Sequence, residues 1–175
     1  MATNLNHFEV FGLQPAFAVD RSALATRYRE LQREFHPDKY ASHSEGEQLL
    51  AIKMAAQINE AHTVLRDPVQ RAAYLLKLAG VDVPPEQTTK DTEFLMQQMM
   101  LRERLEEVRE QPDPAAALDE LIAEARGLIS SEEQRFAETY DGGDLGAAED
   151  SLRKLQFLAK LEKQIDELEE DLFND

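Results

Sequence analysis

Four histidines, His7, His36, His43 and His62, are the side chains best suited to acid–base or metal chemistry near neutral pH. None of them has a metal-ligand spacing with a carboxylate, and no Gly-rich phosphate loop is present. His36 precedes Pro37-Asp38, but no nucleophile accompanies it. The chain has no cysteine, which excludes disulfides, thiolate metal sites and a cysteine nucleophile. We therefore expect a protein that is not an enzyme, with no catalytic residues, no metal site and no cofactor.

The His36-Pro37-Asp38 tripeptide lies between two predicted helices. The first begins after Asp20, a suitable N-cap, and ends near Phe35, whereas the second begins at the capping box Ser44–Glu47 and ends near Leu65. Pro37 disfavours helical geometry at His36, so the chain must turn there. Apolar residues recur at helical spacing in both segments: Leu24, Tyr28, Leu31 and Phe35, then Leu50, Met54, Ile58, Ala61 and Leu65. The pattern predicts an antiparallel hairpin with the tripeptide at its tip, followed by a helix that starts at Pro68.

Basic side chains line the first helix of this hairpin and continue into the turn. They are Arg27, Arg29, Arg33 and Lys39, of which Arg29 and Arg33 share a face at a spacing of four residues. A charged row of this kind is most often an ordinary solvated surface, and it is also suited to docking on an acidic partner. Both interpretations stay open on these residues alone.

Charge divides the 175-residue chain into two parts. Residues 1–80 hold 9 basic and 9 acidic side chains, so residues 81–175 carry the whole net charge of −16. Such an acidic chain gains no counterion-release energy from nucleic acid and is repelled by anionic lipid, so we expect neither as a partner. The N-terminus lacks the features of a signal peptide and no apolar run could span a membrane, which favours a cytoplasmic protein. The Gly80–Pro85 stretch predicts a linker over 81–90 between domains at 1–80 and 91–175.

The pattern of helix boundaries and apolar residues in the second part predicts an antiparallel three-helix bundle. We predict helices from Asp91 to about Glu110, from Asp113 or Pro114 to about Tyr140, and from Asp144 to about Phe173. The expected core stripe of the first is formed by Phe94, Leu101, Leu105 and Val108. The fold class is therefore all-α.

The helix after Asp91 has a second apolar side. Leu95, Met96, Met99 and Met100 flank Glu103 on the side opposite the Phe94 stripe. Such a helix is either fully buried in a larger fold or presents a binding patch, for which adaptable methionines are well suited. Each helix of a small bundle can bury only one stripe, so we expect this side to stay outside. Phe157 lies off the row of Leu155 and Leu158, and we expect it at an exposed or half-exposed position.

The first part resembles a J-domain. The resemblance covers residues 1 to about 76. It rests on five segments: Tyr28-Arg29-Glu30-Leu31, Phe35-His36-Pro37-Asp38-Lys39-Tyr40, Ile58-Asn59-Glu60-Ala61, Leu65-Arg66-Asp67-Pro68 and Arg71-Ala72-Ala73-Tyr74. J-domains stimulate ATP hydrolysis by DnaK-type chaperones. The resemblance implies that His36, Pro37 and Asp38 form the trigger and that Arg27, Arg29, Arg33 and Lys39 dock on the chaperone. No Gly/Phe-rich linker or cysteine-rich zinc module follows this part, unlike the DnaJ type.

The whole chain resembles the HscB family of iron–sulfur co-chaperones. Beyond the J-like part, the resemblance rests on His7–Leu13, Phe94-Leu95-Met96, Leu101-Arg102-Glu103 and Arg153–Leu158. It implies delivery of the iron–sulfur scaffold protein IscU to the chaperone HscA. By position, the implied scaffold patch consists of Leu95, Met96, Met99, Met100, Glu103 and Phe157. Met100 stands where the resemblance leads us to expect a carboxylate.

Two other functions fit parts of the pattern. A general protein-folding J-protein would capture unfolded clients through the methionine-rich side of the helix. A helical assembly protein would use the same side to form a homodimer. The resemblance of the whole chain favours the adaptor that joins HscA to IscU.

Overall fold

The computed structural model describes residues 4–85, 87 and 89–174, and within these ranges the chain is helical with no strand. The elements are α1 (His7–Val10), α2 (Arg21–Glu34), α3 (Glu45–Arg66), α4 (Pro68–Leu78), α5 (Thr92–Glu107), α6 (Pro114–Asp141) and α7 (Leu145–Phe173), with short 3-10 turns at Pro37–Tyr40 and Val108–Glu110. The predicted all-α class is therefore confirmed.

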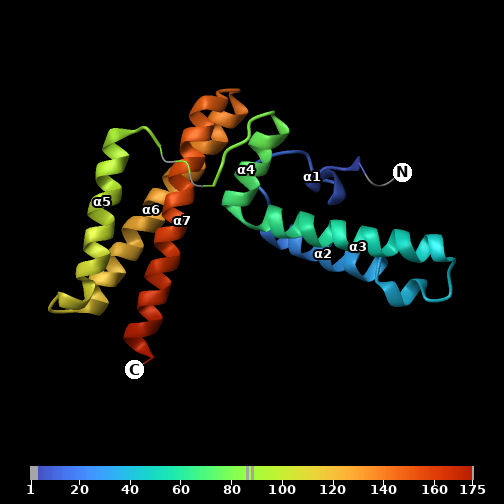
Figure 1. The fold of residues 1–175 in the computed structure, drawn as a ribbon, viewed down its shortest axis with the longest axis horizontal. Coiled ribbons are helices and arrows are strands. Elements are labelled where there is room, and N and C mark those ends of the chain that lie inside the picture. The colour runs from blue at the N-terminus through green and yellow to red at the C-terminus, as the bar shows by residue number, and fades with distance from the viewer. Residues whose placement is uncertain (1–3, 86, 88, 175) are drawn as a thin grey trace. The chain divides into compact units, whose positions relative to one another are not determined.

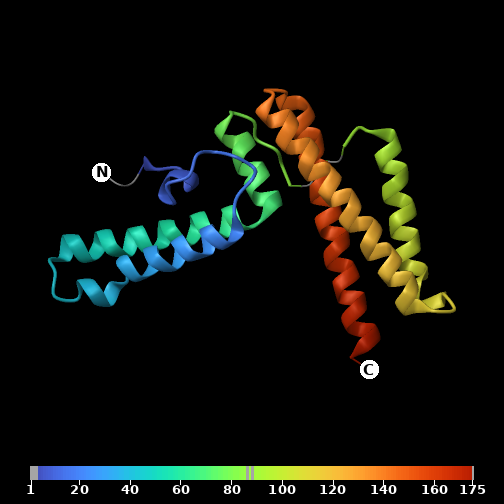
Figure 2. The ribbon, with the colours of Figure 1, turned by 180° about the vertical axis from the view of Figure 1, so that it is seen from behind.

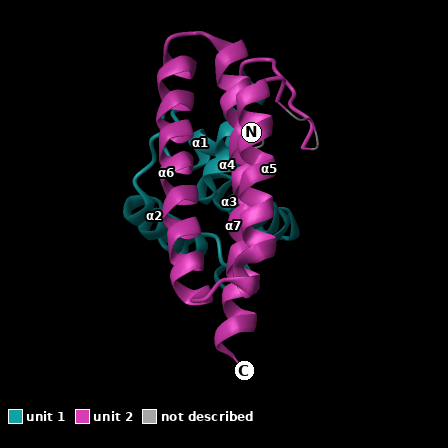
Figure 3. Ribbon diagram, turned by 90° about the vertical axis from the view of Figure 1, so that its left-hand side faces the viewer, with its two compact units in different colours: residues 1–78 teal, residues 79–175 magenta. Residues whose placement is uncertain are grey.

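The helices form two compact units, residues 1–78 and residues 79–175 (Figure 3). The division lies close to the boundary that the charge pattern predicts. The segment predicted as a linker belongs to the second unit, because Thr89 donates a 2.6 Å hydrogen bond to Asp150 of α7 and Gln87 accepts one from Arg153. None of the helices in the described ranges is long and apolar enough to cross a membrane.

An antiparallel hairpin of α2 and α3 dominates the first unit (Figures 1 and 2). Asp20 caps α2 by accepting a hydrogen bond from the amide of Ala23. Ser44 and Glu47 form the predicted capping box, each side chain accepting a hydrogen bond from the backbone amide of the other. These caps satisfy amides that the first turns leave without partners, and they set where each helix begins.

The hairpin packs along apolar stripes, as the spacing predicts, with one exception. Leu24, Leu31, Ile58 and Leu65 are buried, but Leu50 is 45% exposed. The expectation that Leu50 belongs to the core is wrong because residues four apart advance by about 40° around a helix. Two such steps from Ile58 turn Leu50 away from α2, and the neighbouring Ala51 takes the buried place.

Arg71 is a buried cation that joins three segments of the first unit. Its guanidinium donates to the carbonyl of Phe17 at 2.7 Å and to the carbonyl of Leu65 at 2.6 Å, and it lies over the Phe17 ring. The Leu65 carbonyl lies in the last turn of α3, where intrahelical donors run out. One side chain of α4 thus holds the end of α3 and the loop before α2.

In the second unit, α5 packs on the long α6–α7 hairpin. Asp91, Asp113 and Asp144 cap the three helices by accepting hydrogen bonds from backbone amides three residues later. Gly143, with φ of 78°, makes the turn between α6 and α7, a conformation that favours glycine. The buried cluster that joins the three helices consists of Phe94, Leu101, Val108, Leu118, Leu121, Ala125, Phe157, Leu158, Leu161 and Ile165. Together, α5–α7 form the predicted antiparallel three-helix bundle.

We expect Arg71→Met to lower the free energy of unfolding by about 2–4 kcal/mol, because it leaves two buried carbonyls without their charged donor. Urea unfolding followed by circular dichroism measures the change. The control Arg66→Met removes an exposed arginine of α3 and should stay within about 0.5 kcal/mol of the wild type. Equal stability of the two variants would contradict this role for Arg71.

Candidate functional site

The tip of the α2–α3 hairpin is an ordered turn built by the His36-Pro37-Asp38 tripeptide. His36 caps the 3-10 turn Pro37–Tyr40, its Nδ1 accepting a 3.2 Å hydrogen bond from the amide of Asp38. In the neutral ring the proton is therefore on Nε2, which leaves a donor for a partner. The side chains of His36 and Asp38 are 59% and 92% exposed. The turn thus presents polar groups to the surroundings in a fixed backbone geometry.

A basic groove adjoins this tip. It has a volume of about 740 Å³ and is lined by Arg29, Gln32, Arg33, His36 and Lys39. Three of the four basic residues singled out in the sequence therefore meet beside His36. The fourth, Arg27, does not line the groove and makes an ion pair of 3.4 Å with Glu30.

Gln32 joins the groove through a contact that the sequence pattern did not reveal. Its amide donates to the Tyr28 hydroxyl, which in turn donates to Asn59 of α3 at 2.7 Å. The Tyr28 ring stacks on His62 with a centroid distance of 3.7 Å. Burial, and then the charge of Arg66, lowers the pKa of His62, which favours the neutral ring at this stack. The groove face of α2 is thus fixed to α3 by a polar and aromatic contact.

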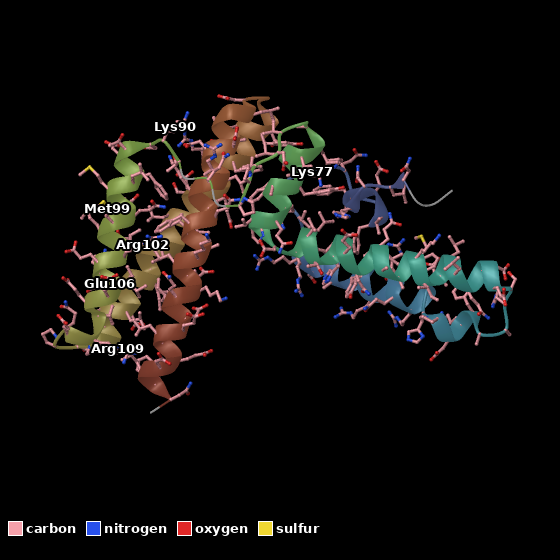
Figure 4. The ribbon with its side chains drawn as sticks, viewed as in Figure 1. Lys77, Lys90, Met99, Arg102, Glu106 and Arg109 are labelled. Carbon is pink, nitrogen blue, oxygen red and sulfur yellow. The ribbon has the colours of Figure 1, made fainter. Side chains whose placement is uncertain are left out.

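The second candidate site is the outward side of α5, which we name the methionine face: Leu95, Met96, Met99, Met100 and Glu103. The three methionines are 61%, 72% and 62% exposed, Leu95 is half-buried and Glu103 is exposed. Met99, Arg102 and Glu106 mark successive turns of this helix in Figure 4. Such a cluster of exposed large apolar side chains is typical of an interaction surface.

Phe157 is buried, and the expectation of an exposed or half-exposed position is wrong. Its side chain is 8% exposed and meets the Phe94 ring edge-on, with centroids 5.9 Å apart. The Arg102 guanidinium covers its ring at 5.3 Å. The α7 helix packs against both α5 and α6, so its buried sector is wider than the row of Leu155 and Leu158. Phe157 of α7 therefore packs against α5 and helps to hold this helix in place.

Lys154 holds the start of α5 on α7. Its side chain is 4% exposed, and its ammonium lies 2.8 Å from the Asp91 carboxylate, 3.1 Å from Asp150 and 3.9 Å from Glu132. It also lies over the Phe94 ring at 5.5 Å. A buried ammonium requires such partners, because its desolvation is otherwise costly.

These contacts move the pKa of Asp91 and the pKa of Lys154 in the directions that favour the charged form of each side chain. The hydrogen bond from Lys154, and then the amide of Phe94, lowers the pKa of Asp91 below its ordinary value. Burial by itself would lower the pKa of Lys154, but the hydrogen bonds to Asp91 and Asp150 outweigh it and raise that pKa. The pair is therefore charged throughout the neutral range.

No group of three or more metal-ligating side chains converges within the described residues. Two exposed surfaces stand out among the described residues. One is basic and lies beside a polar turn, and the other is apolar and lies on a helix of the acidic unit.

Comparisons with known proteins identify both units. Residues 6–74 match the DnaJ domain family, and residues 90–166 match the family described as the HSCB C-terminal oligomerisation domain. A co-chaperone protein HscB homolog of Shewanella baltica is 42% identical over 174 residues, covering 97% of this chain and all of the relative. The chain belongs to the HscB family of co-chaperones.

Other HscB proteins support the assignment. A homolog of Vibrio vulnificus is 44% identical, covering 97% of this chain and 99% of the relative. The solved chaperone HscB from Vibrio cholerae matches with a TM-score of 0.88 at 40% identity, covering 97% of this chain and all of that chain. The human co-chaperone HscB matches with a TM-score of 0.86 at 25% identity, covering 97% and 84%. The predicted resemblance to the J-type co-chaperones of iron–sulfur cluster assembly is confirmed, and J-domain co-chaperones act with Hsp70-type chaperones.

For this HscB-family chain we predict that the Lys154 contacts stabilise the fold most near neutral pH. Because its folded pKa is lowered, Asp91 adds stability above its unfolded value near 3.8, and this stability is lost as the pH falls through the folded value. Lys154, with a raised folded pKa, adds stability below its ordinary value of 10.5 and loses it at higher pH. Lys154→Met should therefore be less stable than the wild type at pH 7, by a margin that shrinks at about pH 3.

Urea unfolding at both pH values measures that margin, with the exposed Lys160→Met of α7 as control. A margin that stays constant or grows in acid would show that the Asp91–Lys154 contact has no such role.

Proposed function

We propose that this protein stimulates the ATPase of an HscA-type chaperone of the DnaK class and delivers an IscU-type iron–sulfur scaffold protein to it. The observation that carries the proposal is the presence of two exposed contact surfaces on two units of one chain, each formed on an ordered element. In this role it assists the maturation of iron–sulfur proteins in the cytoplasm, without catalysing a reaction itself.

The basic groove is the proposed docking surface for the chaperone. Arg29, Arg33 and Lys39 offer positive charge on one face, and complementary charge gives fast, oriented association with an acidic surface. Arg27, paired with Glu30 away from the groove, would contribute at the edge of the contact.

The tripeptide is the proposed trigger. His36 and Asp38 project beside the groove from a turn whose backbone is fixed by Pro37 and by the histidine cap. A partner that binds this turn more tightly in its hydrolysing state is shifted toward that state by the difference in binding energy.

The methionine face is the proposed scaffold surface. Its exposed methionines can adapt to a partner surface, and burial of their apolar area supplies binding energy. Glu103 adds a charge at one side. Phe157 contributes to this surface indirectly, because its contact with Phe94 fixes the position of α5.

We expect His36→Gln to abolish the increase in ATP turnover that the protein causes in its HscA-type chaperone. His36 is exposed and far from the core, so the variant should unfold at the wild-type urea concentration. Steady-state ATP hydrolysis at increasing protein concentrations measures the effect. Wild-type stimulation by the folded variant would show that the tripeptide is not the trigger.

We expect simultaneous substitution of Leu95, Met96 and Met99 by alanine to weaken binding of the IscU-type scaffold at least 100-fold, because the anchors at the centre of an interface carry most of its energy. Titration calorimetry measures the affinity, and chaperone stimulation without scaffold should remain at the wild-type level. A matched control replaces Leu49, Leu50 and Ile52, exposed apolar residues of α3, by alanine and should bind the scaffold normally.

Loss of cooperative melting in the α5 variant would instead mean that this side of the helix supports the fold. Normal scaffold binding by a folded variant would contradict the assignment of the methionine face.

A further inference from the structure

A groove between α5 and α6 opens beside the methionine face. It has a volume of about 570 Å³, and its apolar walls include Phe94, Met96, Met100 and Leu101. Met96 and Met100 also belong to the methionine face, so the groove continues that surface toward α6. A protein bound across the methionine face would therefore cover the groove as well.

The polar groups of the groove carry an excess of negative charge. Asp91, Glu93, Glu124 and Glu132 line it together with only two cations, and both cations are already engaged. Arg104 pairs with Glu124, and Lys154 donates to Asp91 and Asp150.

Glu132 is the carboxylate of this groove with an oxygen that no described residue hydrogen-bonds. Its side chain is 16% exposed, and its Oε1 lies 3.9 Å from the Lys154 ammonium, beyond hydrogen-bond distance. Its Oε2 is buried and accepts no hydrogen bond from any residue that the structure describes. Buried carboxylate oxygens are normally paired, so the Glu132 carboxylate, which lines the groove and is partly exposed there, still has the capacity to accept a hydrogen bond from an external donor.

We propose that the groove receives a lysine or arginine side chain of the scaffold protein that docks on the methionine face. The apolar stem of that side chain would lie along Met96 and Met100, and its charged head would donate to Glu132. This inference rests on the proposed function and adds the chemistry of one contact to it.

Desolvation is the reason why the occupant is cationic. A partner seated on the methionine face removes water from the groove, and a carboxylate left there without a hydrogen-bond donor, with only the Lys154 ammonium 3.9 Å away, would cost binding energy. An anionic side chain would be repelled, and a small inorganic cation would leave the apolar walls uncovered. A long cationic side chain satisfies both the carboxylate and the walls.

Glu132→Gln tests the contact because it keeps the shape of the side chain and removes its charge. We expect the affinity for a purified IscU-type scaffold, measured by titration calorimetry, to fall about tenfold, with a weaker dependence on salt concentration. Glu167→Gln is the matched control: it makes the same change at an exposed position of α7 outside the groove and should leave the affinity unchanged. Thermal melting of both variants shows that the bundle is intact.

A double-mutant cycle then identifies the occupant. Each lysine and arginine on the scaffold is replaced by alanine in turn, and one replacement should weaken binding to the wild type but have little further effect on Glu132→Gln. Unchanged or increased affinity of the folded Glu132→Gln variant, or the absence of any such scaffold residue, would overturn the inference. These results would leave the proposed function standing if the wild type still binds the scaffold, whereas a wild type that does not bind it would contradict the proposed function itself.

Discussion

The second unit depends on a simple packing constraint: α5 meets the α6–α7 hairpin along one stripe. Phe94, Leu101 and Val108 fill that stripe, and Phe94 lies edge-on against Phe157. Lys154 fixes the first turn of the helix through Asp91. With one stripe buried in this way, a three-helix bundle has no further helix to cover the opposite side of α5, and its methionines stay exposed. The same contacts that hold the helix therefore present its methionine face.

The two units differ in charge. The first unit is neutral in total, yet Arg29, Arg33 and Lys39 gather beside the turn at the hairpin tip. The second unit carries the excess acid, part of which lines the groove next to the methionine face. The net charge of −16 therefore does not reveal that the chain has a basic groove on one unit and an acidic groove on the other, each suited to a different protein partner.

The local signals in the sequence predicted most of the fold. Caps at Asp20, Ser44 and Asp91 act within one helical turn, so their spacing is visible in the chain. Burial depends on neighbours far along the sequence, and here the prediction was wrong for Phe157, which two helices enclose, and for Leu50. The Lys154–Asp91 contact joins residues 63 positions apart, and no local pattern indicates it.

In the function that we propose, one chain brings a chaperone and a scaffold protein together through two separate surfaces. Capture of the HscA-type chaperone, in the presence of ATP, by an immobilised IscU-type scaffold tests it most directly. We expect capture to rise and then fall as the protein is added, because excess adaptor occupies each partner separately. A capture that does not depend on the added protein, or that survives loss of the methionine face, would contradict the claim.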